Sequence, residues 1–342
     1  MDAVTGTWSL PVSIGVFLAG ALLTILLGVR LARAGDELAD RTGMGEALFG
    51  SVFFGAMISL SGIVMSATAG AMGNASLAYS NAVGGIAAQL LALGVADMVY
   101  RKANLEHAAA SLQNALFAVL LAILMCVALL GSFAPRWSLW GIHPISPALV
   151  VAYLFGLTVV NRAKADPQWQ PKLTRETVED KPADIPKHSA VRLWTDFVLS
   201  GLIVALGGWG IARAAASIVE HANLDASFVG AILMGLVNAI PETVTAIAAV
   251  RAGALTLAVG GVLGGNAFDV LNLAVGDVAY RDGSLYHAAK SEDIFVTLSG
   301  LMMTLILLGG LLRREKWGPL GIGFEGIALG LTYAVMLAIT AF

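Results

Sequence analysis

The sequence predicts an all-α integral membrane protein whose ten transmembrane helices form two inverted five-helix repeats. Three observations predict this fold: a shortage of charge, a series of long apolar segments, and polar residues that recur at a fixed spacing. Hydrophobic residues make up 58% of the 342 positions and charged residues only 13%, and the mean hydropathy is +0.81. A soluble domain carries about 25% charged residues. This chain therefore lacks the polar residues to cover a surface that faces water.

The apolar segments define the predicted helices, because each membrane-spanning helix needs about 20 apolar residues. Ten segments meet this need, at about 9–30, 46–71, 76–99, 108–133, 138–161, 194–219, 226–250, 254–279, 293–312 and 319–341. The one long polar stretch, 162–192, contains four prolines and mixed charges, which is typical of a solvated linker. We therefore predict a first repeat at 1–161, a cytoplasmic linker at 162–192 and a second repeat at 193–342.

Lys and Arg predict the orientation, since they are more frequent in cytoplasmic loops. With the N-terminus outside, 16 of the 20 Lys and Arg residues fall on the inner side. The first apolar segment is too long for a cleaved signal peptide, so we interpret it as the first membrane helix. We expect a multi-pass protein of a cell membrane, with a bacterial inner membrane as the best fit.

Other classes of protein are disfavoured by composition and by missing motifs. The net charge of −3 and the absence of a basic stripe argue against nucleic acid as a partner. No zinc-hydrolase, nucleophile-elbow or phosphate-loop motif occurs, so we expect neither an enzyme nor a bound cofactor. The single Cys126 excludes an intrachain disulfide. The expected partners are small cations and the lipid bilayer, and the oligomeric state stays open.

An internal repeat links the two halves. The segment that starts at Gly84 matches the segment that starts at Gly264 without a gap, and the matching Asp, Tyr, Arg and His residues are all 180 positions apart. This offset spans five helices, an odd number, so the two copies must cross the membrane in opposite directions. Inverted repeats are typical of secondary transporters, whose substrate site lies at the midplane between the repeats. A duplicated scaffold without transport activity is the alternative.

Two carboxylic acids within predicted helices are the main candidates for an ion site. Glu242 and Asp269 each cost about 2.5–3.5 kcal/mol to place in a membrane, so such residues are usually functional. Asn238 and Asn266 precede them by four and three residues and share their helix faces. Pro241 lacks an N–H and so leaves the carbonyl of Val237 without its helical donor. An all-oxygen site of this kind suits Na⁺ or Ca²⁺. Alternatively, both acids are protonated and bond across two helices.

The segments NAIPE (238–242) and GGNAFD (264–269) resemble the second α-repeat of the sodium/calcium exchanger superfamily, the cation/calcium antiporters. The separation between Glu242 and Asp269 matches the family spacing. The resemblance implies α-repeat motifs at about 50–100 and 230–280. It also implies that Glu242 and Asp269 take the principal carboxylate positions and that Asn238 takes a hydroxyl-ligand position. Gly265 stands where the family usually has serine.

The first half departs from the family pattern. At the equivalent positions of the first repeat, Gly62 replaces the family glutamate, Gln89 takes the acid position, and Ser59 keeps a family-like hydroxyl. The candidate ligands are therefore Glu242, Asp269, Asn238, Asn266, Gln89 and Ser59. The resemblance implies an antiporter that exchanges Na⁺ or H⁺ for Ca²⁺ or another cation by alternating access. Na⁺/H⁺ exchange without Ca²⁺ and a non-transporting scaffold are the alternatives.

Several other polar residues are assigned structural roles. Asp97 and Asp277 precede Arg101 and Arg281 by four residues at predicted helix ends, which is the spacing of a surface ion pair. His107 and His287 begin the following helices without clustered metal-binding partners. Glu325 is expected to reach the membrane interface from the inner end of the tenth helix.

Overall fold

A computed structural model of the chain describes residues 7–42, 56–57, 59–100, 102–165, 169–172, 174, 189–318 and 323–341, all helical or connecting segments. The helices are α2 (Leu10–Thr42), α4 (Leu60–Ala71), α5 (Ala75–Val99), α6 (Leu105–Ala108), α7 (Leu112–Phe133), α8 (Ile145–Ala165), α9 (Ala190–Ala222), α10 (Ala226–Phe228), the π-helix η2 (Val229–Met234), α11 (Gly235–Ala252), α12 (Leu255–Asp269), α13 (Leu271–Ala279), α14 (Leu285–Ala288), α15 (Ser291–Arg313) and α16 (Phe324–Ala341).

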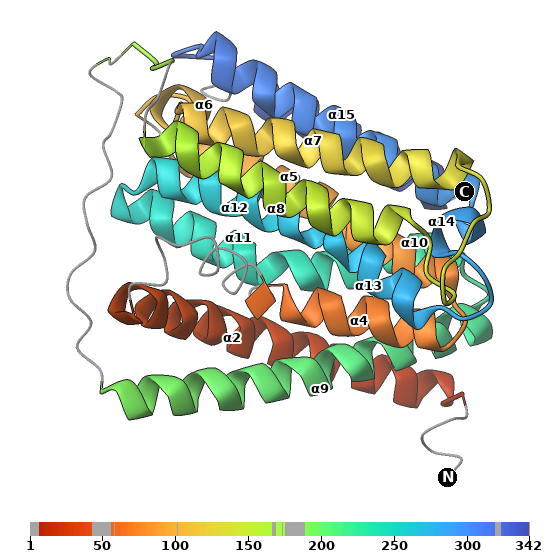
Figure 1. The fold of residues 1–342 in the computed structure, drawn as a ribbon. Coiled ribbons are helices and arrows are strands. Elements are labelled where there is room, and N and C mark those ends of the chain that lie inside the picture. Colours follow the sequence, from red (N-terminus) through yellow and green to blue (C-terminus); the bar gives the residue numbers. More distant parts are fainter. Residues whose placement is uncertain are drawn as a thin grey trace.

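The predicted fold class is confirmed. In the described parts of the chain, nine helical segments are long and apolar enough to cross a membrane, and the shorter α4 is apolar as well. These segments correspond to the ten predicted helices. The short helices α6 and α14, which occupy equivalent positions in the two repeats, lie at opposite ends of the bundle (Figure 1). The two repeats therefore run in opposite directions.

Helix boundaries differ from the prediction where the sequence holds a local turn. The predicted helix at 138–161 begins only at Ile145, because Trp140 and Gly141 adopt positive φ angles of 55° and 81° in a tight turn. The predicted helix at 254–279 is divided at Val270 into α12 and α13. Residues 46–55 and 58 of the predicted helix at 46–71, and most of the linker at 162–192, lie outside the described residues.

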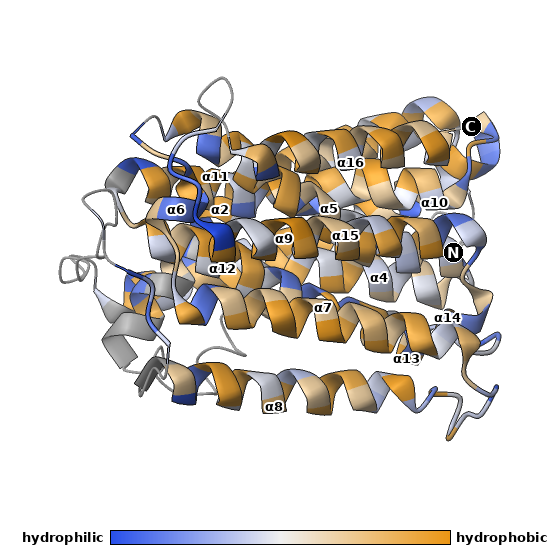
Figure 2. Ribbon diagram, turned by 90° about the horizontal axis from the view of Figure 1, so that it is seen from above, coloured by the Kyte–Doolittle hydropathy of each residue, from blue (hydrophilic) through white to orange (hydrophobic). Residues whose placement is uncertain are grey.

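The sides of the bundle are apolar and its ends are polar. Hydrophobic residues cover the outward faces of the helices, while hydrophilic residues gather at both ends (Figure 2). On α2, Leu18, Leu22 and Leu26 follow one another every four residues and are 62%, 58% and 59% exposed. An exposed apolar stripe on one helix face is unfavourable in water, so this surface is suited to contact lipid.

The long helices α2 and α9 cross each other along one side of the bundle (Figure 1). Glycines allow this close approach: a Cβ at Gly20 would lie 2.9 Å from Cγ1 of Ile211, and one at Gly207 would lie 3.0 Å from the Thr24 hydroxyl. Small residues at a helix interface are the usual means of packing in a membrane, where no hydrophobic effect drives helices together. The pair α2–α9 in turn packs against α4 and α11.

Helix α5 forms the centre of the bundle and is buried along most of its length. It contacts α4, α11, η2, α12, α15 and α16. Asn74 caps its first turn by accepting the N–H of Leu77 at 3.2 Å. The end that carries α6 is called the inner end, because the Lys and Arg bias predicts that it faces the cytoplasm; the opposite end, with α14, is the outer end.

Candidate cation site

The two halves meet at a hydrogen bond between residues that occupy equivalent positions in the repeats. Gln89 on α5 donates from Nε2 to Oδ2 of Asp269, at the end of α12, over 2.8 Å. These two residues are 180 positions apart and therefore equivalent in the two repeats. Their contact lies at the boundary between the inverted repeats. Asn272 on α13 donates to the other carboxylate oxygen, Oδ1, at 3.3 Å. Asp269 is fully buried and accepts these two amide donors without an ion pair to Lys or Arg in the described parts of the chain.

Glu242 supplies the second carboxylate. It lies on α11, is 6% exposed, and is close enough to Asp269 for the two charges to interact. Neither of its carboxylate oxygens has a hydrogen-bond partner. A buried carboxylate without a partner is strongly unfavourable, so the position calls for a bound cation or proton.

Buried amide and hydroxyl oxygens complete the polar environment. Asn266, Gln89 and Asn272 each have a side-chain oxygen without a hydrogen-bond donor, and so does Ser59, whose hydroxyl lies near Asp269. Among the described residues, no three His, Cys, Asp or Glu side chains come together in metal-binding geometry. A cation at this place would therefore be held by two carboxylates together with neutral oxygens. Hard cations such as Na⁺ and Ca²⁺ accept such ligands.

Asn238 connects the site to the position of the missing glutamate. Its Oδ1 accepts the Ser61 hydroxyl at 2.9 Å, across the boundary between the halves. A Cβ on Gly62 would lie 2.9 Å from both amide atoms of Asn238 and 2.9 Å from Nδ2 of Asn272. The space next to Gly62 is therefore filled by two amides from the second half.

Close helix crossing holds these groups together. A Cβ at Gly84 on α5 would overlap the backbone of Ala231 in η2, and one at Gly235 would lie 2.8 Å from the Gly84 carbonyl carbon. Only glycine permits backbones to approach this closely. The π-helix η2 directly precedes α11, and such wide turns are frequent at functional sites. Pro241 lies within α11 one turn later and leaves the Val237 carbonyl without a helical donor, as the sequence predicts.

All six candidate ligands predicted from the sequence are buried in this region, and the structure adds two residues that the prediction missed. Asn272 could have been found, because it lies three residues after Asp269 and therefore on the same helix face. Ser61 could not, because its partner Asn238 is 177 residues away in the sequence.

The assignment of Asp97 and Asp277 to surface ion pairs is wrong, because both aspartates are buried; Arg101 itself lies outside the described residues. Asp97 is buried and accepts the backbone N–H groups of Leu105 at 2.6 Å and Gly323 at 3.1 Å. Asp277 is buried as well, and the exposed Arg281 instead donates to the Trp140 carbonyl. Through hydrogen bonds to backbone N–H groups, each aspartate connects chain segments that lie at one end of the bundle. The expectation for Glu325 is also wrong, because this residue is fully buried rather than at the interface.

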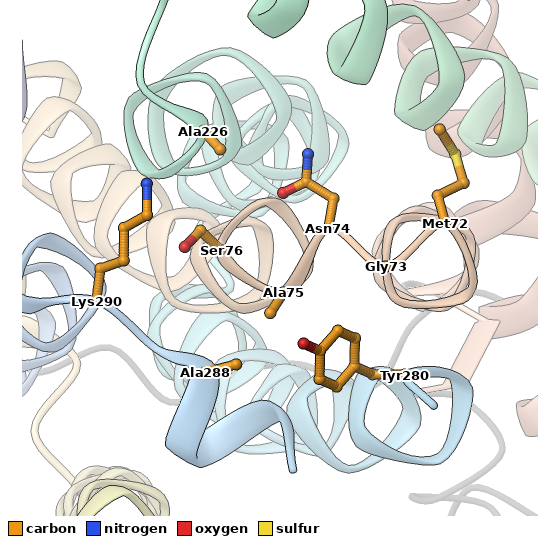
Figure 3. A pocket seen from close by; sticks show the side chains of 9 residues that line it. All are labelled: Met72, Gly73, Asn74, Ala75, Ser76, Ala226, Tyr280, Ala288 and Lys290. Carbon is orange, nitrogen blue, oxygen red and sulfur yellow. The ribbon is translucent and has the colours of Figure 1, made fainter. Parts of the chain in front are cut away.

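An open pocket of about 400 Å³ lies at the outer end (Figure 3). It is lined by Met72, Gly73, Asn74, Ala75, Ser76, Ala226, Tyr280, Ala288 and Lys290. None of the six candidate ligands lines it. Its one charged lining residue, Lys290, pairs with Asp225 at 3.1 Å. The pocket is therefore separate from the candidate cation site.

Comparison with known structures gives the same fold. The native structure of YfkE matches with a TM-score of 0.66 at 15% identity and covers 97% of both chains. The H⁺/Ca²⁺ exchanger CAX matches with a TM-score of 0.68 at 14% identity, over 96% of this chain and 85% of that one. A structure of the sodium–calcium exchanger NCX_Mj has a TM-score of 0.59 at 17% identity and covers 96% and 99%. No curated protein sequence matches this chain.

The family itself is shown by the sequence. The family described as "Sodium/calcium exchanger protein" matches residues 12–160 and again residues 193–342, so the two matches cover most of the chain. Together with the ten apolar helices, the inverted repeats and the shared fold, these matches show that the chain belongs to the sodium/calcium exchanger family of membrane transport proteins.

Proposed function

We propose that the protein exchanges Na⁺ or H⁺ for Ca²⁺ or another cation across the membrane, by alternating access to a midplane site built on Glu242 and Asp269. The observation that carries this proposal is the buried Glu242 carboxylate, which has no hydrogen-bond partner and lies beside Asp269. Asn238, Asn266, Gln89 and Ser59 are the further ligands.

Competition for the same two carboxylates couples the ions. Two negative charges balance one divalent ion or two monovalent ions, so Ca²⁺ and its counter-ions cannot be held together. Because each ion must leave before the other binds, movement of one drives movement of the other. Exchange also requires that the ion-free site, with its two uncompensated buried carboxylates, does not change from one access state to the other.

The α2–α9 pair is the moving part in this proposal. These two long helices pack on each other and meet the bundle through α4 and α11, the helices that carry Gly62 and Glu242. Gly28 on α2 faces Pro241, where a Cβ would lie 2.9 Å from the proline ring. Sliding of the pair over this contact would open the site to one side and close it to the other.

The replaced glutamate favours a second candidate, Na⁺/H⁺ exchange without Ca²⁺. With Gly62 at that position, the site holds two carboxylates, and neutral amides occupy the remaining space. Less negative charge is then available to share between Ca²⁺ and several Na⁺ ions. We therefore expect fewer ions per cycle than three carboxylates would allow.

The orientation and the division of the chain belong to the same proposal. The N-terminus faces outward, the linker at 162–192 is cytoplasmic, and the repeats at 1–161 and 193–342 flank it. This orientation is supported by the 16 of 20 basic residues on the inner side. It fits a bacterial inner membrane.

The first test is ion flux into proteoliposomes under an imposed Na⁺ or pH gradient. We expect Glu242→Gln and Asp269→Asn each to reduce exchange at least 100-fold, equivalent to about 2.7 kcal/mol, while the exposed Glu220→Gln has no effect. Each protein must also elute as a folded species from a sizing column. Normal flux through Glu242→Gln would place the site elsewhere, and no flux of any cation through the wild-type protein would favour a non-transporting scaffold.

A further inference from the structure

The two ends of the bundle contain matching joints, each built around a buried aspartate. In the inner joint, Asp97 accepts the N–H groups of Leu105 and Gly323. In the outer joint, Asp277 accepts those of Leu285 at 2.9 Å and His143 at 2.8 Å. Every one of these residues is 180 positions from its counterpart. His107 and His287 repeat the pattern, since they lie 2.7 Å from the carbonyls of Arg314 and Ala134, which also occupy equivalent positions.

The joints differ in the side chains around the aspartate. In the outer joint, the Ser146 hydroxyl donates to Asp277 at 2.7 Å and lies 3.0 Å from the Tyr286 hydroxyl. This joint is satisfied by neutral groups. In the inner joint, Glu106 takes the position of Tyr286, and Glu325 takes that of Ile145. The outer joint shows that the fold does not require a second acid at either position.

The two additional acids are buried next to Asp97. Glu106 is 1% exposed and Glu325 is fully buried, and none of their four carboxylate oxygens has a hydrogen-bond partner. Glu325 fills the space beside Gly323 and Gly310, where an added Cβ would overlap its carboxyl group. Gly323 is also the residue that donates to Asp97. The buried side-chain oxygen of Asn104 likewise lacks a partner.

Among the described residues, the positive charge that interacts with this cluster comes from Arg313. Asp97 and Glu325 both interact with Glu106. Glu325 also interacts with Glu315 and Arg313, which pair with each other at 3.5 Å. His107 contacts the Arg314 carbonyl and the Thr174 hydroxyl. Three buried carboxylates cannot all be ionised without compensation, and among the described residues they lack the geometry of a metal site.

We propose that the inner joint is a proton-binding site, separate from the central cation site, in which Glu106 and Glu325 beside Asp97 hold at least one proton at neutral pH. A protonated Glu106 supplies a neutral hydroxyl donor at the position where the outer joint has the Tyr286 phenol. The bound proton holds α6 against α5 and the start of α16. Loss of the proton leaves adjacent like charges and weakens this contact.

The pKa of Glu106 agrees with this assignment. Burial, followed by the charges on Asp97 and Glu325, raises the pKa of Glu106 from 4.5 to about 8. An acid whose pKa is higher in the folded state binds more protons there, so its contribution to stability is complete below pH 4.5. That contribution is lost as pH rises toward about 8.

The experiment measures the melting temperature of the full-length protein in detergent between pH 4.5 and 9, which requires no transport activity. We expect the melting temperature of the wild type to fall as pH rises and to level off above about pH 8. The decrease in melting temperature per pH unit, called the slope here, should be at most half as large in Glu106→Gln as in the wild type. In Glu106→Asp, which still titrates, most of the slope should remain. The matched control is Glu220→Gln at an exposed position, and its melting temperature should depend on pH as that of the wild type does.

Equal slopes for the wild type and Glu106→Gln would overturn the proposal. If Glu106→Gln does not fold, Glu325→Gln takes its place: a reduced slope supports the proposal and an unchanged slope contradicts it. A metal ion is tested in the Glu242→Gln background, where the central site is impaired. A rise in melting temperature on adding Ca²⁺ at pH 8 that disappears with Glu106→Gln would show a metal site and overturn proton binding. Failure of the central cation site leaves all of these outcomes unaffected.

Discussion

The two central carboxylates, Glu242 and Asp269, differ in how the protein compensates for their burial. Each costs about 2.5–3.5 kcal/mol at the centre of a membrane helix. Asp269 is partly compensated by amide donors from Gln89 and Asn272, whereas Glu242 has none. This difference assigns the two acids different roles in the proposed site: Asp269 is positioned by the protein, and Glu242 depends on the bound ion.

Two glycines at the site predict opposite effects of substitution. Nothing lies within 4 Å of a Cβ added at Gly265, so Gly265→Ser should fit and restore a hydroxyl ligand. We expect Gly265→Ser to tighten cation binding by up to about tenfold, the effect of one hydrogen bond of about 1.4 kcal/mol. Gly62→Ala forces its methyl group against Asn238 and Asn272, which should lower the free energy of unfolding by about 1–3 kcal/mol; displacement of these two amides should also weaken cation binding.

Calorimetric titration of Ca²⁺ or Na⁺ into both variants measures these changes in affinity. Weaker binding by Gly265→Ser together with unchanged binding by Gly62→Ala would contradict the described site. The same crowding shows that Gly62→Glu does not simply refill an empty glutamate position. In that variant the amides of Asn238 and Asn272 must move first.

At the scale of helices, the contact between the α2–α9 pair and the rest of the bundle limits the proposed movement. Glycines occur on both helices where they face the bundle: Gly28 faces Pro241, and a Cβ at Gly208 would lie 3.0 Å from the Ser61 carbonyl. Helix contacts made by glycines, without protruding side chains, allow one helix to slide over another. A large side chain would instead interlock with its neighbour.

We expect Gly28→Leu to slow exchange at least tenfold while ion affinity changes much less, because the added side chain blocks sliding without touching a ligand. The matched control on the same helix is Gly15→Leu, since nothing lies within 4 Å of a Cβ there. Rates of flux and equilibrium binding are measured side by side. Equal rates for both variants would show that this contact does not limit exchange.

The helices could largely be predicted from the sequence, whereas the contacts between them could not. Apolar length and the fixed offset between the repeats predict ten helices and their inversion from local patterns alone. The break at Val270 and the π-helix at Val229–Met234 were not predicted. Both lie inside long predicted helices, where hydropathy does not distinguish one helical geometry from another. The roles of Asp97 and Asp277 were mistaken because one donor to each lies on a distant segment, 226 and 134 residues away.

At the scale of the whole molecule, the inverted repeat explains both the site and the two joints. Gln89 and Asp269 are equivalent residues that bond to each other where the halves meet, while Asp97 and Asp277 repeat one structural role at opposite ends. The repeats have diverged most at the central ligands, where Gly62 and Gln89 stand opposite Glu242 and Asp269. The two halves therefore keep the same structure at their ends while their central ligands differ.

The orientation of the molecule can be tested with single cysteines. In a background where Cys126 is replaced by alanine, Lys102→Cys should be labelled by an impermeant thiol reagent only after the cells are opened. Arg136→Cys, at the opposite end, should be labelled in intact cells. Both side chains are exposed, so accessibility does not differ between them. The reverse labelling pattern would invert the proposed topology.

The most direct test of the central claim is whether cation release depends on a counter-ion. Proteoliposomes loaded with radioactive Ca²⁺ are diluted into media with or without external Na⁺ or Ca²⁺, at acidic or alkaline external pH, with the membrane potential clamped. A single site that two ions share predicts that Ca²⁺ leaves only when an exchangeable cation is present outside, and that Glu242→Gln abolishes this release. Release of Ca²⁺ at the same rate into a medium without an exchangeable cation would contradict the account.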